Sequence, residues 1–209
     1  MAGWPTTKNK INTSHKNRPD AFITRLKCLQ INLQHSRLDT DNLINIMEEE
    51  GTDTACIQEP NTIGDKIGGM QHFLTVLTFW ERKKRAAIII NNKNIDTLLI
   101  TQISDEDLTV METNAGNARF VIASIYFDIE RPIEVDLNKT HAIITYAKDT
   151  GIISAIDSNA RSTTWHDSLA NKRGKVMEEF IISMHLHIGK EESQYTNLSR
   201  GEPYRLDGH

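Results

Sequence analysis

Hydrophobic and polar positions form two different patterns in the first predicted elements of the chain. In residues 25–34, RLKCLQINLQ, they alternate as they do in a half-buried strand. In residues 39–51, DTDNLINIMEEEG, hydrophobic residues instead recur at helical spacing, with Thr40 or Asp41 as the predicted N-cap and Gly51 as the predicted end. The two patterns predict a strand followed by a helix.

The rest of the chain predicts a strand-rich middle and two further helices. Strands bounded by turn-forming residues are expected at 54–60, 72–79, 85–91, 96–102, 108–113, 119–127 and 152–157. Helices are expected at 139–151 and 171–186. Because strands and helices do not alternate strictly, these elements predict an α/β fold in which two packed mixed β-sheets are flanked by helices, rather than a doubly wound parallel sheet.

Length and composition predict one domain with one sizeable core. The chain has 209 residues, of which 38% are hydrophobic. Residues 1–22 are polar and lack periodicity, so we expect a flexible N-terminal tail before a domain at 23–209. Cys28 and Cys56 lie in hydrophobic runs and fit neither a zinc site nor a disulfide framework, so we expect both to be reduced, buried and structural.

The charge of the chain excludes a wholly basic binding protein, because the formal net charge is −4. A local basic rim on an acidic protein can still attract a DNA backbone. The basic run in residues 81–87, ERKKRAA, is interpreted as a solvated hairpin, with phosphate contact as the less favoured alternative. No hydrophobic run approaches a membrane span or forms the core of a signal peptide, so we expect an intracellular protein without a membrane partner.

Polar residues that interrupt or end hydrophobic strands are the candidates for chemistry. They are Asn32, Glu59, Tyr126, Asp157 and Asn159. The strands of α/β folds commonly place such side chains together at one edge of the sheet. Glu59 and Asp157 offer the hard oxygen ligands that Mg²⁺ prefers, and a bound metal can offset charge on a phosphate ester. Amides at Asn32 and Asn159 would orient the phosphate without repelling it, so the set predicts metal-assisted phosphodiester cleavage.

Each candidate also has a purely structural interpretation. Asn32 could bond a neighbouring strand, Glu59 could be an exposed strand end, and Tyr126 could serve packing. Asp157 and Asn159 could form an Asx turn. Trp165 is interpreted as a core residue beneath the loop that follows them. These alternatives stay open when the residues are taken one at a time.

The order of the motifs resembles a known family. The segments LQINLQHS, IQEP, RAAIII, IYF and DSNARSTTWHD, followed by a helix containing RG…EEF, resemble the endonuclease domain of arthropod non-LTR retrotransposons. That domain belongs to the endonuclease/exonuclease/phosphatase superfamily, with the apurinic/apyrimidinic endonucleases and DNase I. The resemblance runs from about residue 26 to at least residue 180. It implies a four-layer, DNase I-like sandwich.

The resemblance also implies a role for each matching residue. Glu59 matches the metal ligand for Mg²⁺, with Mn²⁺ as an alternative, and Asn32 matches the residue that holds the metal-site carboxylate. Tyr126 matches the group that contacts the scissile phosphate. Asp157 matches the aspartate that activates the attacking water, and Asn159 matches the residue that orients it.

The final residues depart from the family pattern. Asp207, in RLDGH, is at the position of a later catalytic aspartate, but the family's last strand and its Ser-Asp-His motif are not found. His209 follows too closely to replace that histidine. We therefore expect the last strand or strands to be missing from a C-terminally truncated domain. Losing one such electrostatic stabiliser can lower the rate by ~10²–10³.

The resemblance implies that the chain nicks DNA and leaves a 3′-hydroxyl. In a retrotransposon this end would prime reverse transcription of the element RNA by a reverse transcriptase domain of the intact polyprotein, with the nucleus as the site of action. Two alternatives remain at this point. One is an inactive fragment that retains DNA binding. The other is a phosphoesterase of the same fold with a small substrate such as an inositol phosphate.

Overall fold

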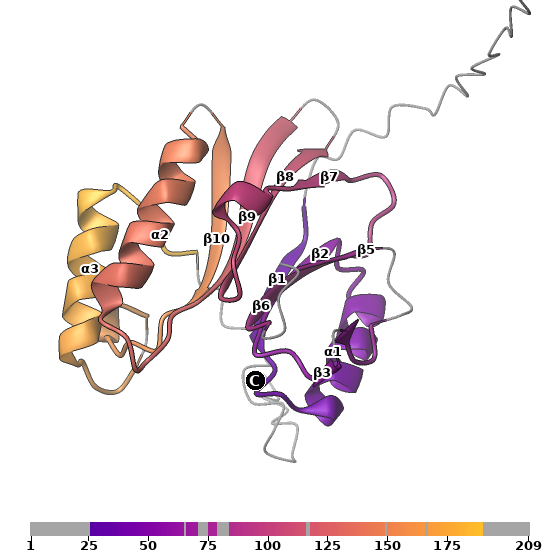
Figure 1. Cartoon of the computed structure of the whole chain (residues 1–209), viewed down its shortest axis with the longest axis horizontal. Coiled ribbons are helices and arrows are strands. Elements are labelled where there is room, and N and C mark those ends of the chain that lie inside the picture. The colour runs from indigo at the N-terminus through magenta and orange to yellow at the C-terminus, as the bar shows by residue number, and fades with distance from the viewer. Residues whose placement is uncertain are drawn as a thin grey trace, which may run out of the picture.

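The computed structural model describes residues 26–64, 66–70, 75–78, 84–115, 118–148, 150–165 and 167–189. Within this part of the chain, two four-stranded sheets pack face to face and helices cover both outer surfaces. Figure 1 shows the layers in order: α2 and α3, then the sheet of β7 to β10, then the sheet of β1, β2, β5 and β6, then α1. The predicted α/β sandwich of two mixed sheets is confirmed.

The first sheet has the strand order β1-β2-β6-β5. Its strands are β1 (Cys28–Asn32), β2 (Thr54–Gln58), β6 (Ala86–Ile90) and β5 (Thr75–Leu77). Helix α1 (Arg37–Glu49) packs on its outer face. A short ribbon of β3 (Thr62–Ile63) and β4 (Lys66–Ile67) follows β2. Strand β1 runs parallel to β2, while β2, β6 and β5 pair antiparallel.

The second sheet has the strand order β10-β9-β8-β7. Its strands are β10 (Gly151–Asp157), β9 (Ala118–Tyr126), β8 (Leu108–Ala115) and β7 (Asp96–Leu99). Its outer face is covered by α2 (Ile133–Tyr146) and α3 (Lys172–Ser183). Two 3-10 turns, Thr101–Ile103 and Thr163–Trp165, complete the described elements. Strand β10 runs parallel to β9, and the other pairs are antiparallel.

Three hydrophobic clusters hold these layers together. Between the sheets lie Cys56, Ile88, Met111, Ile122 and their neighbours. Beneath α1 lie Leu33, Leu43, Met47, Ile57 and Ile89 among others, and beneath α2 and α3 lie Val121, Ile125, Phe127, Ile143 and Met177 among others. Strands β2 and β6 are buried along their whole length because each is covered on both faces, which explains their continuous hydrophobic sequences.

Buried hydrogen bonds fix one sheet against the other. The Gln58 amide donates to Ser124 Oγ at 2.9 Å and to the Ala155 carbonyl at 3.2 Å. Ser124 Oγ in turn donates to the Ile57 carbonyl at 3.0 Å. Both side chains are fully buried; Gln58 is the last residue of β2, and Ser124 lies two residues before the end of β9. The relative position of the strand ends of the two sheets is therefore set by these bonds.

Two helix starts differ from their predictions. Helix α1 begins at Arg37, and its N-cap is Ser36, whose hydroxyl accepts from the Asp39 amide at 3.1 Å. The predicted cap Thr40 lies inside the helix and donates to the Ser36 carbonyl. Helix α2 begins at Ile133 instead of near residue 139, directly after its N-cap residue Pro132.

The prediction of two buried cysteines is wrong for Cys28. Cys56 is fully buried between the sheets, whereas Cys28 is exposed. Strand β1 is the outer strand of its sheet in the described residues, so its side chains have neighbours on one side only. Both thiols are free. Among the described helices, none is long and hydrophobic enough to cross a membrane.

Candidate active site

The parallel strand pairs bring the predicted site residues to one edge of the sandwich. Asn32 ends β1 and lies opposite Gln58 at the end of β2, while Asp157 ends β10 and lies opposite Tyr126 at the end of β9. Parallel neighbours have their carboxyl ends at the same edge, and side chains alternate between the two faces of a sheet. The strand-end side chains consequently extend toward the space between the sheets, as Cys56, Ile122 and Ala155 do further along the same strands.

Asn32 joins the two predicted carboxylates. Its Nδ2 donates to Glu59 Oε2 at 2.8 Å and to Asp157 Oδ2 at 2.6 Å. Its Oδ1 accepts from the Gln34 amide at 2.8 Å, which fixes the orientation of the side-chain amide. Glu59 and Asp157 come from different sheets, so one neutral group holds both halves of the site together. All three side chains are only partly buried and remain accessible.

Tyr126 contacts both sides of this cluster. Burial raises the pKa of its hydroxyl, and the negative charge of Glu59 together with a hydrogen bond to Glu59 raises it further. A hydrogen bond with Asn159 acts in the opposite direction. The phenol therefore stays protonated in the physiological range. It can donate a hydrogen bond to an anion bound beside Glu59 and Asn159.

Asn159 and Glu59 both adopt an uncommon backbone conformation. Their φ angles are +47° and +46°, in the left-handed region that residues other than glycine rarely occupy. The Asn159 amide proton is donated to Asp157 Oδ1 at 3.3 Å, and its side chain donates to the Phe127 carbonyl at 2.9 Å. The Asx-type contact is therefore compatible with the predicted site role, because Asn159 in this turn also forms a hydrogen bond with Tyr126.

Arg85 is a site neighbour that the sequence interpretation assigned to a solvated hairpin. Its side chain is only 8% exposed and forms ion pairs with Asp107, with Asp128 at 2.7 Å and with Glu106 at 3.5 Å. The guanidinium carbon lies 5.1 Å from the centre of the Tyr126 ring, a cation–π contact. The hairpin interpretation is wrong for Lys84 and Arg85, which are both buried, and residues 81–83 lie outside the described part.

The signal for Arg85 was its place directly before a fully hydrophobic strand. A charged residue buried together with such a strand needs oppositely charged partners. The acidic segments SDEDL and YFDIE, which are distant in sequence, supply them. The Glu59 amide also donates to the Arg85 carbonyl at 2.9 Å. Arg85 thus supports Glu59 through its backbone and Tyr126 through its side chain.

His35 also lies next to Glu59. Its Nε2 is 3.7 Å from Glu59 Oε1, and its Nδ1 is 3.2 Å from the Pro60 carbonyl. The His35 amide donates to the Glu59 carbonyl at 2.8 Å, so the turn after β1 is fastened to the turn after β2.

The donor set around Glu59 fits a hard divalent cation that keeps most of its water. Magnesium usually takes one or two protein carboxylates, and Glu59 and Asp157 share a single amide donor. Within the described residues, no three His, Cys, Asp or Glu side chains gather as a metal cage. Asp207 lies outside the described residues, so its predicted role stays a prediction.

An open cavity of about 420 Å³ adjoins the cluster. Asp157 and Asn159 line it, together with Ile129, Arg161, Trp165 and Asn171 among others. Trp165 packs partly buried against the core beneath α2 and α3, as predicted, and its indole nitrogen donates to the Ala160 carbonyl at 3.0 Å. The cavity gives a ligand access to Asp157.

Comparisons with known proteins agree with this architecture. No protein-family model matches the chain, and no curated protein matches its sequence. Among solved structures, the endonuclease domain of TRAS1, a telomere-specific non-LTR retrotransposon, has a TM-score of 0.71 with 23% identity over 80% of this chain and 74% of that domain.

More distant structures share the architecture. The AP endonuclease LMAP from Leishmania major has a TM-score of 0.56 with 13% identity, covering 76% of this chain and 66% of that protein. TDP2 from D. rerio, complexed with a single-strand DNA product, has a TM-score of 0.52 with 10% identity, covering 77% of this chain and 65% of that protein. The chain spans about two thirds of the length of these last two proteins. It therefore has the fold of non-LTR retrotransposon endonuclease domains and AP endonucleases, as the sequence resemblance predicted.

Proposed function

We propose that the protein is a divalent-metal-dependent DNA endonuclease that nicks one strand of its target. The observation that carries the proposal is the convergence of Asn32, Glu59, Tyr126, Asp157 and Asn159 at one edge of the sandwich. Two carboxylates, a neutral phenol and two amides in one accessible place suit a phosphodiester, because they combine a proton acceptor with donors to phosphate oxygens.

The residues divide the chemical work among them. Asp157 accepts the proton of the attacking water. Asn32 orients the Asp157 carboxylate by donating to Oδ2, while Oδ1 accepts a hydrogen bond from the Asn159 backbone amide. Tyr126 donates to the phosphate, as does the Asn159 Nδ2 hydrogen that bonds Tyr126 in the free site. Glu59 would hold Mg²⁺ or Mn²⁺, which supplies positive charge to the phosphate oxygens when bound. Positioning for in-line attack accounts for most of the rate gain in this scheme.

The same proposal gives the nick a biological role. Cleavage that leaves a 3′-hydroxyl would prime reverse transcription of an element RNA by a reverse transcriptase domain, which places the activity in the nucleus. The likeness to an endonuclease domain of a non-LTR retrotransposon supports this role. A DNA substrate is also in keeping with TDP2, whose matched structure contains a single-strand DNA product.

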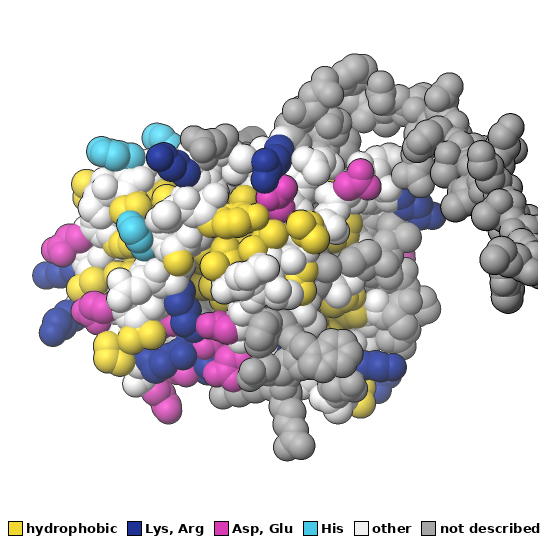
Figure 2. Space-filling model, turned by 45° about the horizontal axis from the view of Figure 1, so that its top comes forward, with side chains coloured by type: hydrophobic (Ala, Val, Ile, Leu, Met, Phe, Trp, Pro, Cys, Tyr) yellow, Lys and Arg dark blue, Asp and Glu magenta, His cyan; other side chains and the backbone are white. Residues whose placement is uncertain are grey.

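Figure 2 views the molecule from the side turned away from the strand ends of the candidate site. On the face that it shows, acidic and basic side chains lie intermixed, and hydrophobic side chains gather toward the centre. The net charge of the chain is −4. Binding to DNA would then rest on local donors and a bound cation rather than on a broad basic surface.

A plasmid-nicking assay tests the proposal. Purified protein is incubated with supercoiled DNA and Mg²⁺ or Mn²⁺, and wild type is compared with Asp157→Asn, which keeps an acceptor for Asn32 but removes the charge. Nicking should fall ~10²–10³, and EDTA should abolish it. The exposed α1 residue Asp41 provides the control Asp41→Asn, which should nick normally. Nicked circles should be extended by DNA polymerase if the product carries a 3′-hydroxyl.

Three results would contradict the proposal. Nicking by Asp157→Asn at the wild-type rate would remove the assigned base. Salt-sensitive DNA binding by wild type without any nicking would favour an inactive DNA-binding domain. Hydrolysis of an inositol phosphate without DNA cleavage would favour a phosphoesterase of the same fold.

A further inference from the structure

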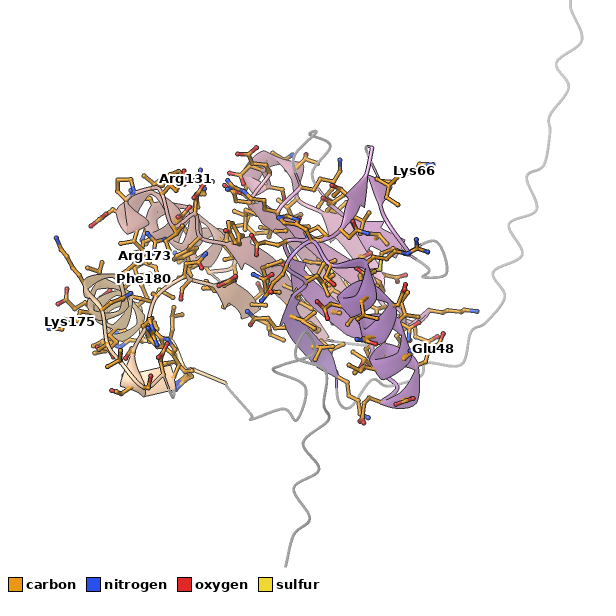
Figure 3. The ribbon with its side chains drawn as sticks, turned by 90° about the horizontal axis from the view of Figure 1, so that it is seen from below. Glu48, Lys66, Arg131, Arg173, Lys175 and Phe180 are labelled. Carbon is orange, nitrogen blue, oxygen red and sulfur yellow. The ribbon has the colours of Figure 1, made fainter. Side chains whose placement is uncertain are left out.

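The N-terminal end of α3 is fastened to the loops that follow Tyr126 and Asp157. Arg173, in the first turn of α3, donates to three backbone carbonyls: Ser158 at 3.2 Å, Arg131 at 2.9 Å and Asp128 at 3.1 Å. Figure 3 labels Arg173 and Arg131 on the side of the molecule formed by the helices α2 and α3. The Arg173 side chain is only 13% exposed, so these bonds form away from bulk water.

Asn171 and Gly174 fasten the same helix end to Arg161. Asn171 caps α3 by accepting from the Gly174 amide at 2.7 Å, and the same oxygen accepts from the Arg161 amide at 3.2 Å. The Asn171 amide donates back to the Arg161 carbonyl at 3.0 Å. A Cβ at Gly174 would lie 1.9 Å from that carbonyl oxygen, so only glycine permits this approach.

These contacts bear on Asn159, one of two site residues with a left-handed backbone. Its φ of +47° is less favourable than an ordinary backbone conformation, so its neighbours help to hold it. Its side chain already joins the two loops by donating to the Phe127 carbonyl. Arg173 joins the same two loops from the helix side, through carbonyls directly before Asn159 and directly after Phe127.

The chemistry of these contacts requires arginine. Three carbonyl acceptors around one planar guanidinium match its fork of donors, and bonds from a charged donor are stronger than neutral ones. A lysine at this position offers one nitrogen and cannot reach all three carbonyls at once. Asp136 Oδ2, which is 3.8 Å from Arg173 NH2, offsets part of the charge.

We infer that Arg173 is a positioning residue for the phosphodiester chemistry: it holds the Tyr126 and Asp157 loops at the mutual distance that keeps Asn159 directed at the substrate. This inference rests on the proposed function. It assigns a purpose to the Arg-Gly pair of the RG…EEF helix, which the catalytic scheme otherwise leaves unused.

The test compares Arg173→Lys with Lys175→Met, an exposed substitution on the same helix. We expect Arg173→Lys to fold, to lose ~10²-fold in kcat for plasmid nicking with KM changed less than about threefold, and to lose hydrogen-exchange protection of residues 158–161. Lys175→Met should match wild type in all three measurements. An unchanged kcat, a loss confined to KM, or unchanged protection at residues 158–161 would overturn the inference.

Hydrogen exchange keeps the inference testable in two further cases. If Arg173→Lys does not fold, hydrogen exchange of the wild-type protein is measured instead. The amides of Arg161 and Asn171 should exchange together with those of the first turn of α3, and rapid, independent exchange of the Arg161 amide would overturn the inference. If wild type shows no nicking, the proposed function fails, whereas the protection measured in the two variants still decides whether Arg173 holds the loops.

Discussion

Individual residues of the site serve more than one neighbour at a time. One amide nitrogen of Asn32 satisfies carboxylates from two sheets, and the Tyr126 hydroxyl is shared between Glu59 and Asn159. Such sharing means that each substitution disturbs at least two groups, so single-variant effects at these positions will not add. The pKa of the Tyr126 hydroxyl therefore depends on the groups that surround it in the folded protein.

The raised pKa of Tyr126 predicts how stability changes in alkali. A hydroxyl whose pKa is higher in the folded state than in the unfolded chain favours folding below the unfolded value, near 10, and that contribution is lost as the pH rises through the folded pKa. Wild type should therefore lose free energy of unfolding above about pH 10 more steeply than Tyr126→Phe. Urea unfolding at a series of pH values measures this. Parallel curves for the two proteins would show that Tyr126 contributes nothing to the alkaline loss.

At the scale of elements, the two sheets are held in register by buried polar bonds as well as by hydrophobic packing. Gln58 and Ser124 are both fully buried, and they connect β2, β9 and β10 just behind the strand ends. Hydrophobic contacts tolerate small sliding movements, whereas hydrogen bonds of this length do not. The polar pair thus determines how the halves of the site face one another.

Removing the Ser124 hydroxyl should be costly. Ser124→Ala leaves the buried Ile57 carbonyl and the Gln58 amide short of one partner each, which should lower the free energy of unfolding by about 1–3 kcal/mol. Ser183→Ala removes an exposed hydroxyl at the end of α3 and should change it by less than about 0.5 kcal/mol. Chemical denaturation of both variants gives the comparison. Equal effects would mean that the inter-sheet bonds are not stabilising.

At the scale of the whole molecule, the arginines around the site are already engaged with carboxylates. Arg85, Arg131, Arg161 and Arg173 each lie within 4 Å of an acidic side chain. Ion-paired guanidinium groups are less available to phosphates than unpaired ones. Together with a net charge of −4, this pairing indicates that the proposed DNA binding would neutralise few phosphates.

The salt dependence of DNA binding should accordingly be shallow. Each neutralised phosphate contributes a slope of about −0.9 to log K against log [salt], so we expect a total slope on the order of −2 to −4. Divalent cation should strengthen binding at constant ionic strength, because it supplies the charge that the protein lacks. Fluorescence anisotropy with a labelled duplex at several salt concentrations measures the slope. A slope near −8 would indicate an extensive basic surface instead.

The sequence predicted the fold and the convergence of five candidate residues because both follow from local pattern. Asn32, Glu59, Tyr126, Asp157 and Asn159 stand at or just after the ends of recognisable strands, and parallel pairing brings the strand ends of each sheet to one edge. The pairing of distant charges is not a local property, which explains the wrong interpretation of residues 81–87.

Two further errors have the same origin in long-range structure. The exposure of Cys28 depends on β1 being an outer strand, which its own sequence does not reveal. Helix α2 extends back to Ile133, and its first turn carries Asp136, which lies 3.8 Å from Arg173 in the distant helix α3. Hydrophobic period alone locates the middle of such a helix better than its start.

The division of the site between two sheets has a consequence for how such a protein can change over time. Asn32 and Glu59 belong to one sheet, Tyr126 and Asp157 to the other, and the side chains of Cys56, Met111 and Ile122 fill the space between them. A mutation that enlarges or shrinks these side chains would move one half of the candidate site relative to the other. Selection on catalysis would therefore extend to interior positions that never meet a substrate.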